Sequence, residues 1–279
     1  MSLVSTRELL DHAVAQGTAV PALNVIHLES AEAIAAAAER AGHGAVLQIS
    51  QNCVKYHGAL ASIAAAARAV ARTCGAPLSL HLDHAEDVDL VHQALDLGFS
   101  SVMYDGAALP YAQNVATTAQ VVRAAGAAGA LVEAELGEVG GKDGAHAPGV
   151  RTDPDEAGRF VAETGVDALA VAVGSSHAMT SKTASIDTAL VAALAEAVPV
   201  PLVLHGSSGV PDADITAAIG AGMRKINVST QLVRAFTGAV RGCLDADPAL
   251  VDSRAYLGAG RVAMTTEAAA VIALIAGRV

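Results

Sequence analysis

The segment PLSLHLDH, residues 77–84, has the pattern of a buried strand that ends in polar groups. Apolar residues alternate along it, and the strand runs directly into His81, Asp83 and His84. A carboxylic acid beside an imidazole suits a site where a Lewis acid and a proton carrier act on neighbouring atoms of one substrate. A strand end with merely solvated side chains has the same local pattern, so the positions of the other polar residues must distinguish the two interpretations.

The composition indicates a protein of the cytoplasm. The chain has 279 residues, within the range of a single α/β barrel, and 53% of them are hydrophobic. Much of this hydrophobic content is alanine, and charged residues interrupt the long apolar runs, so we expect no membrane-spanning segment. The start, MSLVSTRELLDHAVAQG, is typical of a capped amphipathic helix rather than a signal peptide. Three widely spaced cysteines fit reduced thiols.

The charge and the aromatic content narrow the classes of ligand. A net charge of −11 makes general binding to nucleic acid or to an acidic membrane unfavourable. Only 3% of residues are aromatic and none is tryptophan, which removes the usual stacking platforms for bases and sugars. We therefore expect a small polar or charged ligand.

Strand and helix patterns alternate along the whole chain. Apolar strand patterns occur at residues 19–26, 45–50, 77–84, 100–106, 130–137, 167–174, 201–209 and 224–230, and a helical pattern follows nearly every one. Eight such units with near-continuous apolar strands favour a closed (β/α)8 TIM barrel over an open sheet. We expect one domain over residues 1–279, with a short N-terminal helix and a C-terminal helical extension.

Polar residues follow the ends of these strands. In a barrel of this kind the chemistry lies at the C-terminal ends of the strands. Each of the eight ends supplies a polar or metal-ligating group: Asn24, Ser50, Asp83 with His84, Asp105, Glu135, the segment 174–177, His205 and Asn227. Scattered solvated residues would not follow strand ends so regularly, which favours an active site at this rim.

Three histidines at separate strand ends suggest an open metal site. His84, His177 and His205 would leave a zinc ion one position for substrate. Asp105 and Glu135 are candidates either for further metal ligands or for outer partners of the histidines. Strand alternation would turn His84 away from the side that Asp83 faces, so the prediction requires a bend at the strand end.

Two segments favour a phosphate group near the last strands. Residues 206–209 (GSSG) and 227–230 (NVST) each lie where a strand meets a helix N-terminus, and Lys182 could add a cation. The glycine-rich segment 138–153 is too long for a simple connector. A phosphorylated substrate, an open metal site and a nearby acid fit cleavage of a carbon–carbon bond beside a ketone.

At this point the sequence resembles the class II, zinc-dependent ketose-bisphosphate aldolases. The stretches that carry the resemblance span most of the chain: HLDH (81–84), EAELGEVGG (133–141), TGVDALAVAVGSSH (164–177), PLVLHGSSGVPD (201–212) and KINVSTQL (225–232). The chain is most similar to the tagatose-bisphosphate branch. The resemblance implies cleavage of tagatose or fructose 1,6-bisphosphate to dihydroxyacetone phosphate and glyceraldehyde 3-phosphate, in a homodimer or homotetramer.

The resemblance also implies a role for each matching residue. Asp83 would donate a proton to the aldehyde oxygen, His84, His177 and His205 would hold zinc, and Asp105 and Glu135 could hold a second or displaced cation, divalent or monovalent. Residues that would contact the substrate are Asn24, Ser50, Ala178, Lys182, Gly206, Ser207, Ser208, Asn227, Val228, Ser229 and Thr230. Arg254 would reach the second phosphate, across a subunit contact.

Three positions depart from the family pattern. Asp143 stands in the loop where the family carries a glutamate base, and Ala178 replaces a glycine whose backbone approaches phosphate. Ser229 replaces an aspartate of fructose-specific members, which favours tagatose-type or relaxed stereochemistry.

Other functions stay open. A Schiff-base aldolase needs a desolvated lysine, and none of the four lysines is expected at a strand end beside the acids. A metal-dependent hydrolase on this barrel would favour His-x-His, where the chain has His81 and Asp83. The departures also permit a sugar-phosphate-binding barrel that has lost turnover or changed its substrate.

Overall fold

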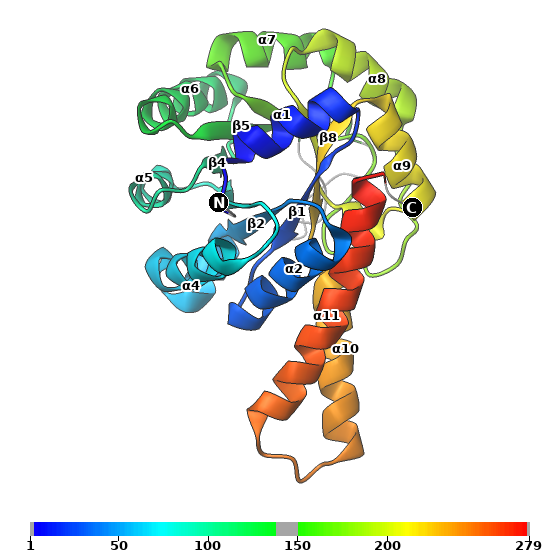
Figure 1. Ribbon diagram of the computed structural model, residues 1–279. Coiled ribbons are helices and arrows are strands. Elements are labelled where there is room, and N and C mark those ends of the chain that lie inside the picture. Colours follow the sequence, from blue (N-terminus) through cyan, green and yellow to red (C-terminus); the bar gives the residue numbers. More distant parts are fainter. Residues whose placement is uncertain (1–2, 138–149, 278–279) are drawn as a thin grey trace.

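Eight parallel strands close into a barrel in sequence order, with β1 pairing with both β2 and β8. The computed structural model describes residues 3–137 and 150–277 of the chain, and Figure 1 shows helices around the sheet. The strands are β1 (Val20–Asn24), β2 (Ala45–Ser50), β3 (Leu78–Ala85), β4 (Ser101–Tyr104), β5 (Leu131–Leu136), β6 (Ala168–Val171), β7 (Leu202–Leu204) and β8 (Met223–Val228). The predicted (β/α)8 fold is confirmed.

Each strand sends alternate side chains into the barrel and outward to the helices. Towards the strand starts the interior is apolar and includes Val20, Val46, Leu131 and Val203. The outward side chains join the helices in a separate and larger core. Both faces of a parallel strand are buried, which explains the near-continuous hydrophobicity of these segments.

Several helices begin and end at local capping signals. They are α1 (Thr6–Gln16), α2 (Leu28–Ala41), α3 (Gln51–His57), α4 (Leu60–Thr73), α5 (Val88–Asp96), α6 (Tyr111–Ala128), α7 (Pro154–Thr164), α8 (Thr188–Ala197), α9 (Asp212–Ala221), α10 (Thr230–Ala246) and α11 (Ser253–Ile275), with a 3-10 turn at Ser207–Gly209. In α1, Ser5 and Glu8 form a capping box, and Gly17 ends the helix in the left-handed conformation. Leu10 and Ala13 of α1 pack on the apolar interior of the barrel.

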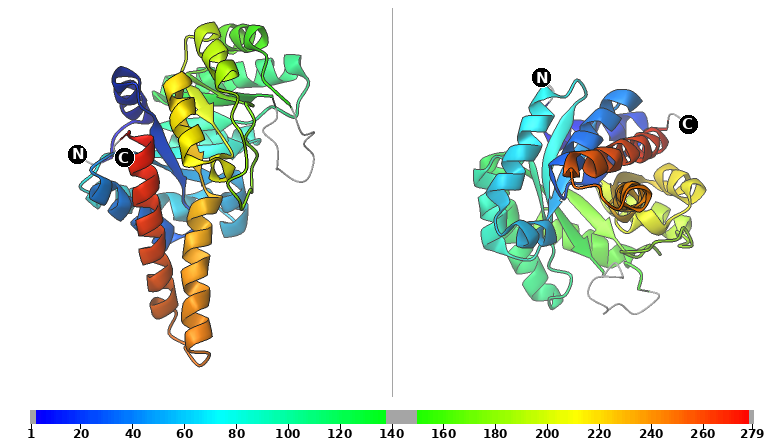
Figure 2. Two further views of the ribbon diagram at one scale, coloured as in Figure 1. Left: turned by 90° about the vertical axis from the view of Figure 1, so that its right-hand side faces the viewer. Right: turned by 90° about the horizontal axis from the view of Figure 1, so that it is seen from below.

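The last two helices form a hairpin that extends beyond the barrel (Figures 1 and 2). The inner part of α11 packs on α2, and α11 runs beside α10. By length and composition α11 could also cross a membrane, although a third of its most apolar window is buried inside the protein. The hairpin turn is exposed, with Val251 at 89% of its maximal accessibility.

Two local features differ from the sequence-based prediction. Residues 51–57, which were not assigned to a helix, form α3, and Ser50 caps it by accepting a hydrogen bond from the Cys53 backbone N–H. The strand predicted at 201–209 is short, because β7 ends at Leu204 and a turn begins at Gly206 with φ of 66°. His205 therefore lies just beyond its strand.

Candidate active site

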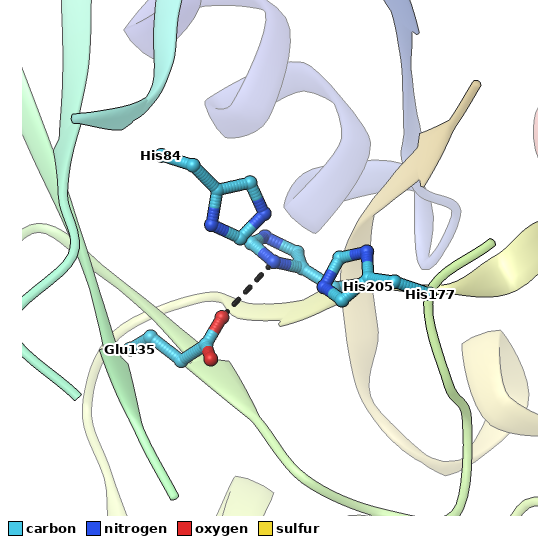
Figure 3. Close-up of side chains that lie close together, drawn as sticks. All are labelled: His84, Glu135, His177 and His205. Carbon is cyan, nitrogen blue, oxygen red and sulfur yellow. Dashed lines mark ion pairs between the residues drawn. The ribbon is translucent and has the colours of Figure 1, made fainter. Parts of the chain in front are cut away.

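Four side chains with metal-ligating atoms converge at the C-terminal end of the barrel. His84 comes from β3, Glu135 from β5, His177 from the segment after β6, and His205 from the residue after β7. One ligand atom of each lies within 4.8 Å of the others, and Figure 3 shows the three rings and the carboxylate facing a common point. Histidine nitrogen and glutamate oxygen are ordinary zinc ligands.

A local irregularity in β3 turns His84 into this group. The pairing of β3 with β4 shifts register between Leu82 and Ala85. His84 itself has φ of 48°, in the left-handed region that residues other than glycine seldom adopt. Asp83 and His84 therefore both line one cavity although they are consecutive. The bend that the sequence required is present.

Carboxylates orient two of the three imidazoles. His84 Nδ1 lies 2.8 Å from Asp105 Oδ2, and His205 Nε2 lies 2.9 Å from Glu133 Oε1. Each ring then has its second nitrogen available to a metal, the arrangement that fixes ring and tautomer in metal sites. Nδ1 of the fully buried His205 lies 3.2 Å from Glu135 Oε2. This donor set fits a divalent ion such as zinc.

A buried ion pair lies beneath the metal-ligating group. Lys225 Nζ is 2.8 Å from Glu133 Oε2, and both side chains are 1% exposed. Lys225 thus lies beside a barrel acid, but in the middle of β8 (Met223–Val228) and not at the strand end. Lys225 is absent from the cavity lining, so it offers no amine to a substrate carbonyl. The strand period places residue 225 on the same face as Asn227, and residue 133 on the same face as Glu135, but it does not show that residues 225 and 133 lie in one layer.

These charges determine the protonation of the buried histidines. Burial would lower the pKa of His205, but hydrogen bonds and charges of Glu133 and Glu135 raise it to about 9. Burial, together with the charge of Lys225, lowers the pKa of His81 to about 3. His81 Nδ1 contacts Ser101 Oγ at 2.8 Å inside the barrel, so His81 is a neutral packing residue.

Asp83 is held by two amides. Asn24 Nδ2 and Asn227 Nδ2 donate to its two carboxylate oxygens, each at 3.3 Å. Burial acts to raise the pKa of Asp83, but the charges of His84, His205 and Lys225 outweigh it and lower the pKa below its usual value. Asp83 is thus an ionised carboxylate beside the metal-ligating histidines.

A cavity of about 310 Å³ opens over this group. The predicted residues that line it are Asn24, Ser50, Asp83, His84, His177, Ala178, Gly206, Ser207, Ser208, Asn227, Ser229 and Thr230. Sequence reasoning missed five others, Gln48, Gln51, Asn52, Lys55 and Glu86. Three of them belong to α3, a helix that was not predicted from the sequence: Gln51, Asn52 and Lys55. Asp105 and Glu135 lie next to the histidines, outside the lining.

Three predicted substrate-binding residues of the described part of the chain do not line the cavity. Val228 is buried in the core between barrel and helices. Lys182 pairs with Asp212 on the surface, and Arg254 pairs with Asp252 near the tip of the α10–α11 hairpin, with its side chain 90% exposed. Neither cation lines the cavity of its own chain. Asp143 lies outside the described residues.

Ala178 also lines the cavity and has φ of 57°. A left-handed conformation costs an L-residue about 1–2 kcal/mol, whereas glycine adopts it freely. The backbone at Ala178 thus has a conformation that suits glycine, the residue that the family resemblance implies for this position.

The fold and the site define a (β/α)8 barrel with a group of side chains at its carboxyl end that could hold a metal ion. The profile described as "Fructose-bisphosphate aldolase class-II" matches residues 4–277. The chain belongs to this family, and it is a metal-dependent aldolase, a carbon–carbon lyase.

Solved structures agree with this assignment. The YdjI aldolase from Escherichia coli K12 superposes with a TM-score of 0.86 at 30% identity, over 98% of this chain and 97% of that one. A putative fructose-1,6-bisphosphate aldolase from Coccidioides immitis gives 0.85 at 29% identity, over 97% and 95%. The fructose-bisphosphate aldolase of Campylobacter jejuni gives 0.83 at 22% identity, over 98% and 95%, and shares the fold.

Proposed function

We propose that the protein is a zinc-dependent aldolase that reversibly cleaves a ketose 1,6-bisphosphate of tagatose or fructose type. The products are dihydroxyacetone phosphate and glyceraldehyde 3-phosphate. The observation that supports this best is the convergence of His84, His177 and His205 with Glu135 beside the ionised Asp83. A metal and a proton carrier can then act on neighbouring substrate oxygens.

The three histidines would hold zinc, with Glu135 as a further ligand. Zinc would act there as a Lewis acid, stabilising negative charge on the ketose carbonyl oxygen. Asp105 and Glu133 keep two of the rings in place from behind. We retain a second divalent or monovalent cation near Asp105 and Glu135 as part of the proposal.

Asp83 would exchange the proton of the aldehyde oxygen. In the cleavage direction it removes the proton from the C4 hydroxyl, the C3–C4 bond breaks, and the electron pair passes to the dihydroxyacetone phosphate half. In the condensation direction Asp83 returns that proton to the aldehyde oxygen. Asp143 is the proposed base for the carbon-bound proton of dihydroxyacetone phosphate.

The C1 phosphate would bind where the ends of β7 and β8 meet helix N-termini. Gly206, Ser207 and Ser208 form the turn after β7, and Ser229 and Thr230 begin α10. Ser208 Oγ accepts the Gln231 backbone N–H at 3.2 Å, which joins the two segments. Backbone N–H groups and the helix dipole favour an anion there.

Arg254 would meet the second phosphate from a neighbouring subunit, which is consistent with its exposed place near the hairpin tip. We therefore propose a homodimer or homotetramer, in the cytoplasm. A non-catalytic or altered-specificity sugar-phosphate-binding barrel is the second candidate. It is favoured by Ala178, whose methyl group occupies the cavity wall where the family has glycine.

Steady-state cleavage of tagatose and fructose 1,6-bisphosphates, with and without a chelator, tests the proposal. We expect turnover of at least one sugar, its loss with chelator, and its recovery on adding zinc. Release of dihydroxyacetone phosphate is measured with a coupled assay. Cleavage of neither sugar by the zinc-loaded protein would favour the second candidate.

A further inference from the structure

Lys225 contacts both Glu133, which orients His205, and Asn227, which holds Asp83. Its ammonium group is buried inside the barrel and donates to two acceptors, Glu133 Oε2 and Asn227 Oδ1, each at 2.8 Å. Glu133 holds His205, and Asn227 holds Asp83. We propose that Lys225 is a positioning residue that fixes His205 and Asp83 together.

The first arm is the series of contacts Lys225–Glu133–His205, and it fixes the ring of His205. Glu133 uses one carboxylate oxygen for Lys225 and the other for His205 Nε2, so it cannot rotate without losing a contact. When the His205 ring gives up one proton to bind a metal, the remaining proton must lie on Nε2, because the ionised Glu133 carboxylate only accepts. Nδ1 is then the nitrogen with a free lone pair, and it faces the other metal-ligating side chains.

The second arm is the series of contacts Lys225–Asn227–Asp83, and it fixes the orientation of the Asn227 amide. A lysine ammonium can only donate, so Asn227 must turn its oxygen towards Lys225 and its NH2 group towards Asp83. Without the ammonium the amide could rotate and present its oxygen to the Asp83 carboxylate. Two acceptors would then face each other, and Asp83 would lose one of its two amide donors.

Lysine suits this position because it has three donors, no acceptor and a positive charge. The charge balances Glu133, whose pKa burial would raise but which Lys225 and His205 hold below its usual range. The contact also crosses the barrel, since β5 and β8 are not neighbouring strands. One side chain thus relates residues from β3, β5, β8 and the end of β7.

The metal part of this inference needs only the histidine site, whereas the Asp83 part rests on the proposed function. Four variants distinguish the effect of Lys225 on metal binding from its effect on Asp83. Glu133→Gln alters the first arm alone, and Lys225→Met removes both arms. The double variant Glu133→Gln/Lys225→Met leaves no unpaired buried charge if the single Lys225→Met variant fails to fold. Ser79→Ala is the matched control, because Ser79 is equally buried but bonds to Thr6 in the barrel interior.

Three measurements are made on each variant: the zinc dissociation constant by chelator competition, the visible absorption of the cobalt-substituted protein, and kcat at saturating zinc with the sugar that the wild type cleaves. We expect about 10- to 100-fold weaker zinc binding and an altered cobalt spectrum in every variant except Ser79→Ala. Saturating zinc should restore kcat in Glu133→Gln. In the variants without Lys225 we expect kcat to stay at least about tenfold low, because Asp83 is no longer held.

Wild-type zinc affinity and an unchanged cobalt spectrum in the Lys225 variants would overturn the first arm. Full recovery of kcat at saturating zinc would overturn the second arm. If the wild type cleaves neither sugar, the proposed function fails, while the zinc and cobalt measurements still test the first arm. A crystal structure of the zinc-loaded double variant then tests the second, since an unmoved Asp83–Asn227 contact would refute it.

Discussion

His84 Nδ1 lies 2.8 Å from Asp105 Oδ2, so the end of β4 supports a ligand presented by the irregular end of β3. His205 is supported in the same way by Glu133 from β5. Two of the three histidines are thus held by carboxylates that lie in a barrel strand, Glu133 in β5, or directly after one, Asp105 after β4. Sites on rigid elements hold their geometry better than sites on loops.

Asp105→Asn should weaken metal binding by about 10- to 100-fold, because an amide is a poorer partner for the His84 N–H than a carboxylate is. The dissociation constant is measured by chelator competition in the absence of substrate. Asp153→Asn is the control, since Asp153 caps α7 on the surface. Equal affinities in the Asp105 and Asp153 variants would show that Asp105 does not support His84.

Metal removal should destabilise the folded protein as well as inactivate it. Zinc at about 1,000 times its Kd stabilises the folded state by about 4 kcal/mol. In a chain of this size each kcal/mol moves Tm by roughly 2 °C, so Tm should rise by about 8 °C. Thermal denaturation with chelator, zinc or magnesium measures this. Magnesium prefers oxygen ligands and should leave Tm unchanged, and an equal shift with magnesium would argue against a histidine site.

Gly206 should tolerate no side chain, because it turns the chain between His205 and Ser207. It has φ of 66°, and an added Cβ would lie 2.6 Å from the carbonyl of Ser176. Gly206→Ala should lower the free energy of unfolding by at least about 1–2 kcal/mol, and kcat should fall with it. In α9, Gly220 has open space around an added Cβ, so Gly220→Ala should stabilise by about 0.5–1 kcal/mol. Chemical denaturation compares the two, and equal effects would refute a special role for Gly206.

The strand ends could be predicted from sequence because the pattern that marks them is local. In PLSLHLDH the alternation and the polar end lie within eight residues, and barrel closure then brings such ends together. Lys225 and Glu133, which are in contact, lie 92 residues apart in the sequence. It depends on which inward side chains share a layer, and this is known only once the register of β5 and β8 is known.

The wall of the cavity formed by α3 was missed for a different reason. Residues 51–57 are too few for a periodic apolar pattern to identify a helix, and Ser50 is read equally well as a strand end. Arg254 shows the opposite limit. Its motif suggests a phosphate contact, but Arg254 lies in the first turn of α11 and does not line the cavity of its own chain. A contact with the substrate therefore requires the Arg254 of another subunit.

Lys55 should contact the second phosphate of the substrate, in addition to the Arg254 that we propose reaches it from a neighbouring subunit. Among the described residues that line the cavity it is the one lysine or arginine, and α3 follows β2, the neighbour of the strand that carries Asp83. A charge-assisted hydrogen bond contributes about 1.5–3 kcal/mol. Lys55→Met should therefore raise KM for a ketose bisphosphate by about tenfold or more, and leave cleavage of the matching ketose 1-phosphate unchanged. Steady-state kinetics on both sugars, with Arg254→Met in parallel, measure this. If Arg254→Met raises KM for the bisphosphate and Lys55→Met does not, the second phosphate binds at the subunit contact without Lys55.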